Sequence, residues 1–471
     1  MRLRHLTLLP FALLTAYADS PAALPQDEPR RSSQSEGGPD AVMLRRIYDA
    51  ALTDSPAYDH LGELVAKYPG RLSGSKTLEN AVLWAKAVLE KQGVDRLELQ
   101  PVMVPHWERG APESVRFIGS DGKASPLTAF ALGGSVPTPA GGLRAPVVEL
   151  HSLDELKTAD VKGKIVFFNR PMDPKAVNPG DAYGGAGDQR NKGPGAAAPY
   201  GAVGVLTRSL THATDDVPHT GNTKYEDGVP RIPAAALSTL AANRLSAALK
   251  ADPKLQAELV INSKWFDPAP SYNVIGELRG SEHPEQIIVV GGHLDSWDVT
   301  PGAHDDGAGV VHSIEVLRLL QAVGYKPRHT LRCVLFTSEE NSTNGGKEYA
   351  RVVGEKKEIH LFALESDNGG YQPIGFQLGN TAGDAPARAA RWRTLLEPYR
   401  LNVFESGPGG ADVGPLIDHG ATVGEIIPES QRYFDYHHTT IDTMDKVNPR
   451  ELQLGAAAMA ALVYLVDQHG L

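Results

Sequence analysis

Three predominantly apolar segments in the C-terminal half of the chain restrict its fold more than any other feature. They cover residues 286–290, 330–336 and 359–364, and such segments are typical of parallel strands that are buried on both faces of a sheet. Apolar residues at helical spacing lie between and after them, at 309–320 and 346–353. Strands that alternate with helices predict an α/β fold with a doubly wound sheet, mixed but mainly parallel.

Histidine or carboxylate residues follow each of these strands. After the first strand come His293 and Asp295, after the second Glu339 and Glu340, and after the third Asp367. In open α/β sheets, ligands bind outside the carboxyl ends of the strands, so we expect these side chains to meet at one edge. Nitrogen and oxygen donors together favour a hard or borderline divalent cation. The sequence therefore predicts a metal site at this edge of the sheet.

Two further segments supply residues of the same kind. A Gly-rich turn before the helix at 309–320 contains His304 and the pair Asp305-Asp306, and the loop before the last helix contains His437 and His438. A purely structural interpretation is also open, since aspartates can cap a helix and paired glutamates can be solvated. Because so many carboxylates at one edge would repel one another without cations, the metal interpretation is favoured. Adjacent residues point in different directions, so His304 and His437 are expected to support the site.

Net charge and cysteine content exclude several functions. The chain has 46 Lys and Arg against 57 Asp and Glu, a net charge of −11, and so lacks the basic surface that nucleic-acid binding needs. Cys333 is the only cysteine, which excludes intramolecular disulfides and thiolate metal sites. Its place in an apolar strand indicates a core residue. No apolar segment is long enough to span a bilayer comfortably. We therefore expect no membrane as a partner and, because of the net charge, no nucleic acid.

The composition along the chain predicts five regions. A positively charged start, a short apolar segment and a small-x-small cleavage site predict a signal peptide at 1–18, and hence a secreted or periplasmic protein. Residues 19–39 offer almost nothing to bury and predict a disordered linker or pro-segment. The main domain is predicted in two parts, 40–125 and 268–471. A β-rich domain with much Gly, Ala and Pro is inserted between them at 126–267.

Five short motifs are similar to those of one enzyme family. They are HLDSWD at 293–298, GAHDDGAG at 302–309, SEEN at 338–341, ESD at 365–367 and HHTTIDTM at 437–444. In combination they resemble the motifs of the di-zinc aminopeptidase and glutamate carboxypeptidase family, and the resemblance covers nearly all of the chain after residue 40. It implies a zinc exopeptidase fold. The inserted domain resembles a protease-associated (PA) domain.

The resemblance implies two zinc ions per chain, bound at the residues that match the family's ligands. His293 and Asp367 would bind one ion, and Glu340 and His438 the other. Asp305 would bridge the two ions. The predicted metal site is therefore a two-zinc centre in which one carboxylate is shared.

The same resemblance implies the roles of two further carboxylates. Glu339 matches the family's general base, and Asp295 matches the carboxylate that holds a ligand imidazole in the right tautomer. His438 rather than His437 is assigned as a ligand, because the family's ligand stands four residues before an Asp/Glu-Thr pair, here Asp442-Thr443.

The activity that the resemblance implies is hydrolysis of dipeptides or short peptides by a secreted metallo-exopeptidase. A water that bridges two zinc ions becomes a stronger nucleophile, and Glu339 can take its proton as the attack begins. We expect the inserted domain, which is tethered at two points, to cover the site and admit only short peptides. Its Gly-rich stretch, 180–195, is expected to be an irregular loop that is mobile or contacts a partner. A homodimer is also implied.

Two other functions stay open at this point. Glutaminyl cyclase activity on the same fold would use a single zinc ion. A binding protein with an inactive site would use the PA domain and no zinc. Metal analysis separates the three hypotheses, since two zinc ions per chain favour a peptidase, one a cyclase, and none a binding protein.

Overall fold

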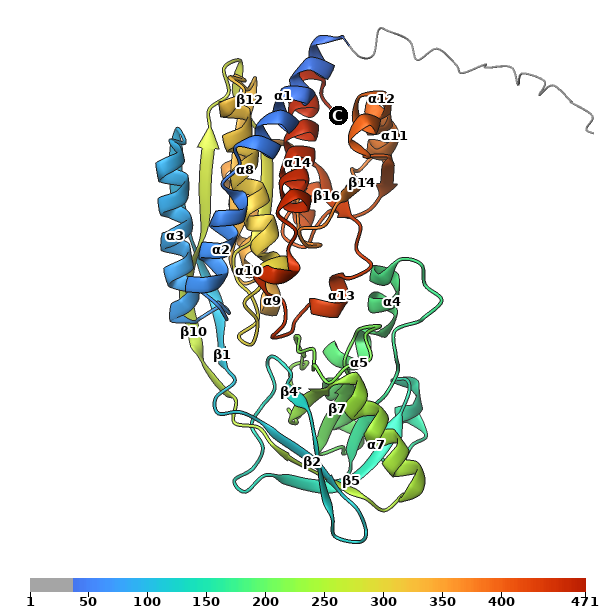
Figure 1. The fold of residues 1–471 in the computed structure, drawn as a ribbon. Helices are drawn as coiled ribbons and strands as arrows, with labels where there is room; N and C mark the ends of the chain where they lie inside the picture. The colour runs from blue at the N-terminus through green and yellow to red at the C-terminus, as the bar shows by residue number, and fades with distance from the viewer. Residues whose placement is uncertain (1–36) are drawn as a thin grey trace, which may run out of the picture.

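The computed structural model describes residues 37–471, which form a larger and a smaller unit, drawn one above the other in Figure 1. The signal peptide predicted for 1–18 lies outside the described residues, as does most of the segment predicted for 19–39. Each unit is built around one mixed sheet. The chain therefore has a mixed α/β fold.

The larger sheet has a parallel centre, made of the three apolar segments. Among the described residues it has eight strands, in the order β1 (Arg96–Glu108), β10 (Lys264–Leu278), β12 (His329–Phe336), β11 (His283–His293), β13 (Ile359–Glu365), β16 (Thr422–Pro428), β14 (Pro373–Gly379) and β15 (Val403–Ser406). Strand β11 pairs in parallel with β12 and β13, and β13 pairs in parallel with β16. The carboxyl ends of the three predicted strands therefore lie side by side at one edge.

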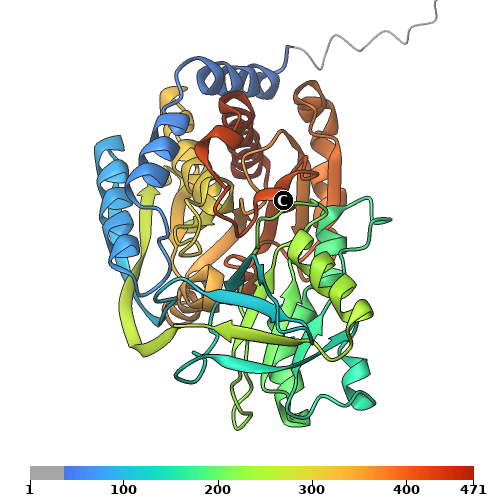
Figure 2. The ribbon, with the colours of Figure 1, turned by 60° about the horizontal axis from the view of Figure 1, so that its bottom comes forward.

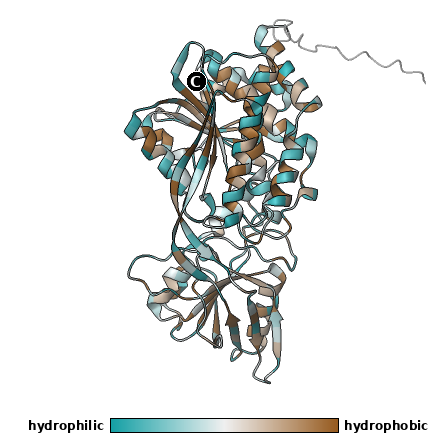
Figure 3. Ribbon diagram, turned by 90° about the vertical axis from the view of Figure 1, so that its left-hand side faces the viewer, coloured by the Kyte–Doolittle hydropathy of each residue, from teal (hydrophilic) through white to brown (hydrophobic). Residues whose placement is uncertain are grey.

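Helices cover both faces of this sheet. On one face lie α1 (Pro39–Thr53), α2 (Ala57–Lys67), α3 (Lys76–Gln92), α8 (Ala308–Ala322) and α14 (Pro449–His469), and on the other α10 (Asn344–Lys356). The strands between these layers are largely hydrophobic (Figure 3). In the part of the chain that the structure describes, no helix combines the length and the apolar character needed to cross a membrane.

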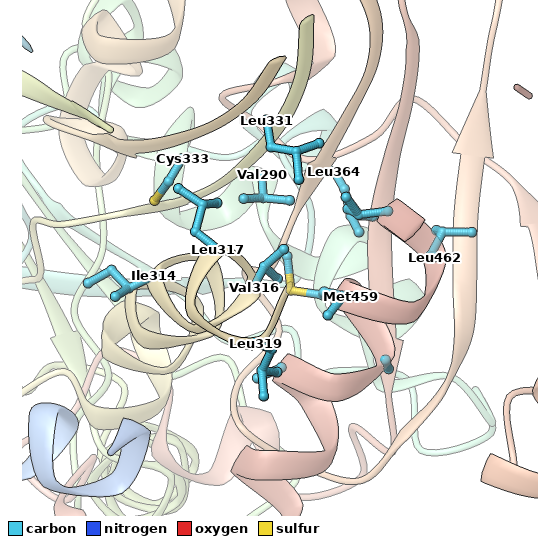
Figure 4. Packing of buried hydrophobic residues seen from close by; sticks show 14 of the residues in the cluster. Val290, Ile314, Val316, Leu317, Leu319, Leu331, Cys333, Leu364, Met459 and Leu462 are labelled. Carbon is cyan, nitrogen blue, oxygen red and sulfur yellow. The ribbon is translucent and has the colours of Figure 1, made fainter. Parts of the chain in front are cut away.

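Side chains alternate between the two faces of β11, which explains why this strand is apolar throughout. Val290 faces α8 and α14, where it lies in one cluster with Leu317 and Met459 (Figure 4), whereas Val289 belongs to the cluster on the α10 side. Cys333 of β12 is fully buried in the first cluster, as predicted for a core residue. Burial of a Val, Leu or Met side chain in these clusters stabilises the fold by about 1.5–3 kcal/mol. Well-packed layers on both faces thus hold the edge of the sheet in place.

The smaller unit contains the second sheet. Its strands among the described residues follow the order β3 (Ala124–Leu127), β2 (Ser114–Ile118), β9 (Gln256–Val260), β5 (Leu143–Leu150), β6 (Ile165–Phe168), β7 (Gly204–Arg208), β8 (Ala234–Leu237) and β4 (Ala129–Ala131). Helix α7 (Thr239–Ala251) packs on this sheet. The change in composition predicted that the inserted domain begins at residue 126, but β2 pairs with β3 and β9. The smaller sheet therefore begins at Ser114, before the change in composition that set the predicted boundary.

Two long strands connect the units. Strands β1 and β10 are paired antiparallel from Arg96 and Glu277 in the larger sheet to Glu108 and Lys264, where the chain enters and leaves the smaller unit. Strand β1 is an edge strand of the larger sheet. The smaller unit is thus attached at two adjacent points of one edge, and in Figure 2 it comes toward the viewer in cyan and green.

The Gly-rich stretch 180–195 is helical, so the prediction of an irregular loop was wrong. It forms α4 (Pro179–Ala186), α5 (Asp188–Asn191) and α6 (Gly193–Ala197). Asn178 caps α4 by accepting the main-chain N–H of Gly180 at 2.9 Å. Tyr183 of α4 stacks on Phe434 of the larger unit, with ring centroids 4.5 Å apart. This tertiary contact helps to order a segment whose glycine content predicted irregular structure.

Candidate metal centre

Three potential metal ligands lie together at the carboxyl ends of β11 and β13. The Nε2 atom of His293 lies 3.3 Å from Oδ1 of Asp305 and 3.3 Å from Oδ1 of Asp367. His293 ends β11, Asp367 follows β13, and Asp305 lies in the turn before α8. His293 and Asp305 are buried, and Asp367 is half-buried. This group has the donor atoms and the spacing to hold one metal ion.

A second pair of ligands lies on the other side of Asp305. The Nε2 atom of His438 is 3.1 Å from Oε2 of Glu340 and 3.3 Å from Oδ2 of Asp305. Asp305 thus presents one carboxylate oxygen to each group. The structure brings together all five residues that were assigned as ligands, and we call them the metal centre.

The turn that carries Asp305 is held by hydrogen bonds to its main chain. Asp442 accepts the main-chain N–H groups of His304, at 2.8 Å, and of Asp305, at 3.1 Å. The neighbouring Asp306 accepts the N–H of His293 at 2.9 Å and another N–H, in the first turn of α8, at 2.9 Å. Of the two adjacent aspartates, Asp305 therefore faces the metal centre, while Asp306 links β11 to α8.

Arg71 supports the metal centre, although the sequence did not indicate this role. Its side chain is fully buried and donates to the main-chain oxygens of Leu294 at 2.6 Å, Pro301 at 2.6 Å and Gly302 at 2.9 Å. These carbonyl groups belong to the segment between β11 and α8 that presents Asp305. An isolated arginine gives no sequence signal for this role, because its partners follow 223 or more residues later.

Asp295 connects the ends of two strands. Its carboxylate accepts the main-chain N–H of Glu339 at 3.0 Å and that of Glu340 at 3.3 Å. The Nδ1 atom of His293 donates to the main-chain oxygen of Asp295 at 3.1 Å, and the Asp295 carboxylate lies 3.6 Å from the same atom. Both contacts leave Nε2 of His293 facing the metal centre. Asp295 thus also fixes the main chain of Glu339 and Glu340, a role that the sequence did not indicate.

His437 and His438 both face the metal centre, so the expectation that His437 points away was wrong. Their rings stack with centroids 3.5 Å apart, and Nε2 of His437 lies 3.6 Å from Oδ2 of Asp305. His438 has a φ of 63°, a left-handed conformation that is uncommon for residues other than glycine. This turn of the chain brings the two neighbouring rings to the same side.

The smaller unit helps to position His438. The main-chain oxygen of Thr220 accepts the Nδ1 proton of His438 at 3.2 Å, and the N–H of Thr220 donates to the main-chain oxygen of His438 at 3.1 Å. The ring of His219 donates from Nδ1 to the main-chain oxygen of His437 at 2.8 Å. With Nδ1 of His438 held in this way, Nε2 faces Asp305. The two units therefore build the metal centre together.

His304 points away from the metal centre. Its Nδ1 accepts the N–H of Gly370 at 3.1 Å, and its ring stacks on Tyr371 with centroids 4.3 Å apart. Burial lowers the pKa of His304 to about 4, which keeps the ring neutral and able to accept. His304 thus supports the segment after β13, in line with the supporting role expected of it.

A cavity of about 380 Å³ opens on the metal centre between the two units. The larger unit lines it with Glu339, Asn368, Glu425, Tyr433, Phe434 and His437, besides ligands of the centre, and the smaller unit with Gly180, Tyr183, Arg190 and Asn222. The residues of the smaller unit had no signal in the sequence, because nothing along the chain shows which of its loops faces the strand ends. The cavity is large enough to bring a small substrate to the metal centre.

The charges at the metal centre fit cations. Oδ2 of Asp305 and Oδ1 of Asp367 are buried without a hydrogen-bond donor. Burial raises the pKa of Glu339, His293 lowers it, and the carboxylates of Asp367, Asp295 and Asp305 add to the rise, which together bring the pKa to about 8. Buried carboxylates are unfavourable unless they are paired or bind a metal. Two imidazoles and three carboxylates are ligands that zinc takes in proteins, so the residues present fit zinc.

Several known proteins are similar in sequence to this chain. The model of Peptidase family M28 matches residues 273–463, a range that contains the whole metal centre. The chain is 34% identical to carboxypeptidase Q of Homo sapiens over 430 residues, which cover 90% of this chain and 88% of that protein. It is 36% identical to carboxypeptidase Q of Xenopus laevis, with 90% and 89% covered.

Two solved structures have the same architecture. A peptidase M28 precursor from Shewanella amazonensis matches with a TM-score of 0.85 and 35% identity, over 91% of this chain and 96% of that chain. A zinc aminopeptidase from Bacillus subtilis matches with a TM-score of 0.63 and 21% identity, over 88% of this chain and 95% of that chain. The second likeness shows that the fold is shared.

Removal of metal should lower the stability of the protein. Zinc at a free concentration 100 times its dissociation constant stabilises a folded chain by about 2.7 kcal/mol. Without zinc, the carboxylates of the centre repel one another. We expect dialysis against a chelator to lower the Tm by several degrees, and zinc to restore it, as measured by scanning calorimetry.

A matched variant controls for zinc bound elsewhere. In Asp305→Ala, both sides of the centre lose a ligand, so added zinc should no longer raise the Tm. A Tm that does not respond to chelator or zinc in the unmodified protein would contradict the assignment of this centre.

Proposed function

Because the chain belongs to peptidase family M28 and is a zinc-dependent exopeptidase, we propose that it is a secreted enzyme that hydrolyses dipeptides and other short peptides. Its relatives include carboxypeptidases and aminopeptidases, which remove residues from opposite ends of a peptide. The single observation that carries the proposal is the position of Asp305, whose two oxygens face two separate groups of ligands beside a cavity.

We assign two zinc ions to the metal centre. His293 and Asp367 would hold one ion, Glu340 and His438 the other, with Asp305 in contact with both. When bound, two zinc ions polarise a peptide carbonyl and lower the pKa of a water molecule. The geometry favours two ions over the single ion of a glutaminyl cyclase, because each oxygen of Asp305 has its own imidazole at 3.3 Å.

Glu339 is the proposed general base. It lines the cavity beside Glu340, and its main-chain N–H is fixed by Asp295. Its main-chain N–H forms this hydrogen bond, and no group of the described residues forms one with its carboxylate, so the carboxylate can accept a proton from water. Glu339 can therefore take a proton from the attacking water and deliver it to the leaving amine. Since Glu340 faces His438 instead, the two adjacent glutamates have separate tasks.

The smaller unit is proposed to be a PA domain that covers the metal centre. Tyr183, Arg190 and Asn222 of this unit line the same cavity as the ligands of the larger unit. Ligand pockets are commonly found between domains, and a cavity enclosed from both sides admits a short peptide more readily than a folded protein. This arrangement supports cleavage of short substrates.

Secretion and dimer formation are proposals that rest on the sequence. The signal peptide predicted for residues 1–18 supports export. The family resemblance supports a homodimer that acts on short peptides, with neither nucleic acid nor a membrane as partner. Light scattering of the purified protein after size-exclusion chromatography measures the mass of the assembly and tests the dimer.

Replacing Glu339 by Gln should remove most of the activity and none of the metal. The change deletes the proton acceptor but no ligand, so we expect kcat to fall at least about 100-fold while zinc content, measured by elemental analysis, stays at the level of the unmodified protein. Glu355→Gln, at an exposed position of α10, is the matched control. Near-normal turnover by a fully zinc-loaded Glu339→Gln protein would rule out the proposed base.

Zinc content should also separate the roles of His437 and His438, which both approach Asp305. His438→Ala should lose about half of the bound zinc, because its Nε2 contacts Glu340 as well as Asp305 while Thr220 holds its Nδ1. His437→Ala should keep its zinc, since no hydrogen bond to a described residue holds its ring in a ligand position. The opposite order of zinc loss would show that His437 is the ligand.

A further inference from the structure

A second cavity, of about 570 Å³, lies within the smaller unit, and its lining residues differ from those of the cavity at the metal centre. It opens at the carboxyl ends of β5, β6 and β7, which are parallel neighbours in the smaller sheet. Glu149 and His151 lie at the end of β5. Asn169 follows β6, and Arg208 ends β7. Ligands bind at the carboxyl ends of such strands in open α/β sheets, so this position is one where a ligand is expected.

Helix α7 also lines the second cavity. It contributes four residues, Asn243, Ser246, Ala247 and Lys250. Successive members of this set are one or three positions apart along the helix, and residues three or four positions apart are neighbours on a helix surface. The second cavity is therefore formed by three strand ends and one helix face.

Arg208 is a half-buried arginine of this cavity without an acidic partner among the described residues. Its Nη1 donates to Oδ1 of Asn243 at 2.8 Å and to Oδ1 of Asn169 at 3.3 Å. Its Nε is buried without an acceptor. Burial lowers the pKa of Arg208, and no charged group of the described residues offsets this effect. A buried charge is unfavourable unless it is paired, so the guanidinium favours an anion in the cavity.

Glu149 fixes the amide group that holds Arg208. Oε1 of Glu149 accepts from Nδ2 of Asn169 at 2.6 Å and from the hydroxyl of Ser246 at 2.9 Å. Because its Nδ2 is used in this way, Asn169 presents Oδ1 to Arg208. The guanidinium is thus held in position by neutral amides, and its charge is left for a ligand.

The charges that line the second cavity favour a ligand with a single negative charge. Arg208 and Lys250 bring two positive charges and Glu149 one negative charge, with the imidazole of His151 counted as neutral. One negative charge on the ligand balances this sum. A phosphate dianion would exceed it and would be repelled by the carboxylate of Glu149. A carboxylate also matches the planar donors of an arginine.

We propose that the second cavity is a binding site for a small organic carboxylate, whose oxygens accept hydrogen bonds from Arg208 and Lys250. The apolar lining residues Pro171 and Ala247 are in place to contact the body of such a ligand, and the cavity volume leaves room for it. The inference goes beyond the proposed function, because this site lies in the smaller unit and includes no residue of the metal centre.

The test titrates the zinc-loaded protein by isothermal calorimetry with 4-methylpentanoate, with the neutral 4-methylpentanamide and with inorganic phosphate. We expect 4-methylpentanoate to bind with a Kd of about 1 mM or tighter. The amide and phosphate should each bind at least about 10-fold more weakly, since the amide lacks the charge and phosphate exceeds it. Absence of carboxylate binding, or tighter binding of phosphate, would overturn the inference.

Two variants locate the binding. Arg208→Gln should weaken the binding of 4-methylpentanoate about 10- to 100-fold, whereas Arg244→Gln, at an exposed position of α7 outside the lining of the cavity, should leave it unchanged. A carboxylate can also bind zinc, and such binding would persist in Arg208→Gln and be lost in Asp305→Ala. That second pattern would overturn the inference, because it would place the carboxylate at the metal centre.

Asn243→Asp tests the same charge without removing Arg208. The new carboxylate takes the place of the amide oxygen that lies 2.8 Å from Nη1 of Arg208, so it pairs with the guanidinium and competes with the ligand. We expect the binding of 4-methylpentanoate to weaken at least about 5-fold. Unweakened binding by a folded Asn243→Asp protein would show that Arg208 does not bind the carboxylate, and this variant decides the question should Arg208→Gln fail to fold.

Discussion

The side chain of Asp305 puts a carboxylate into the protein interior, where it lies within 3.3 Å of imidazoles from two separate groups of ligands. Such a group is stable only when its charge is compensated, and the surroundings are built to hold it there. Asp442 binds the main chain of its turn, and Arg71 binds the preceding segment. The same carboxylate joins the ends of β11 and β13 to the segment around His438. The two groups of ligands therefore meet at this one position.

Much of the larger unit could be predicted because its signals are local. Strands buried on both faces are apolar throughout, as Val289 and Val290 show, and the strands β11, β12 and β13 lie where the apolar segments predicted them. The ends of parallel strands meet at one edge, so residues that follow them, such as His293 and Asp367, are brought together by the sheet itself. The strand pattern therefore predicts that His293, Glu340 and Asp367 lie near one another, whereas the ligand roles of Asp305 and His438 were implied by the family resemblance.

Other parts of the site depend on contacts that leave no local trace. Arg71 is a single residue whose partners lie elsewhere in the fold. Thr220 contacts His438 through its main chain, so the identity of its side chain does not indicate this role. The orientation of His437 depends on the backbone angle of His438, which a residue other than glycine rarely adopts. The start of the smaller unit was predicted too late for a related reason. Strand β2 has the composition of an ordinary strand, and only its pairing with β9 shows which sheet it joins.

The pairing of β1 with β10 has a consequence for how the chain folds. The smaller unit leaves and returns through the adjacent residues Glu108 and Lys264, so pairing of these two strands already closes the loop that contains this unit, and its own sheet forms without a further loop-closure cost. The contact between Thr220 and His438 joins residues 218 positions apart and forms only when the two units dock. Contacts of such sequence separation are slow to form. The contacts from Thr220 that hold His438 at the metal centre are thus complete only once the two units have docked.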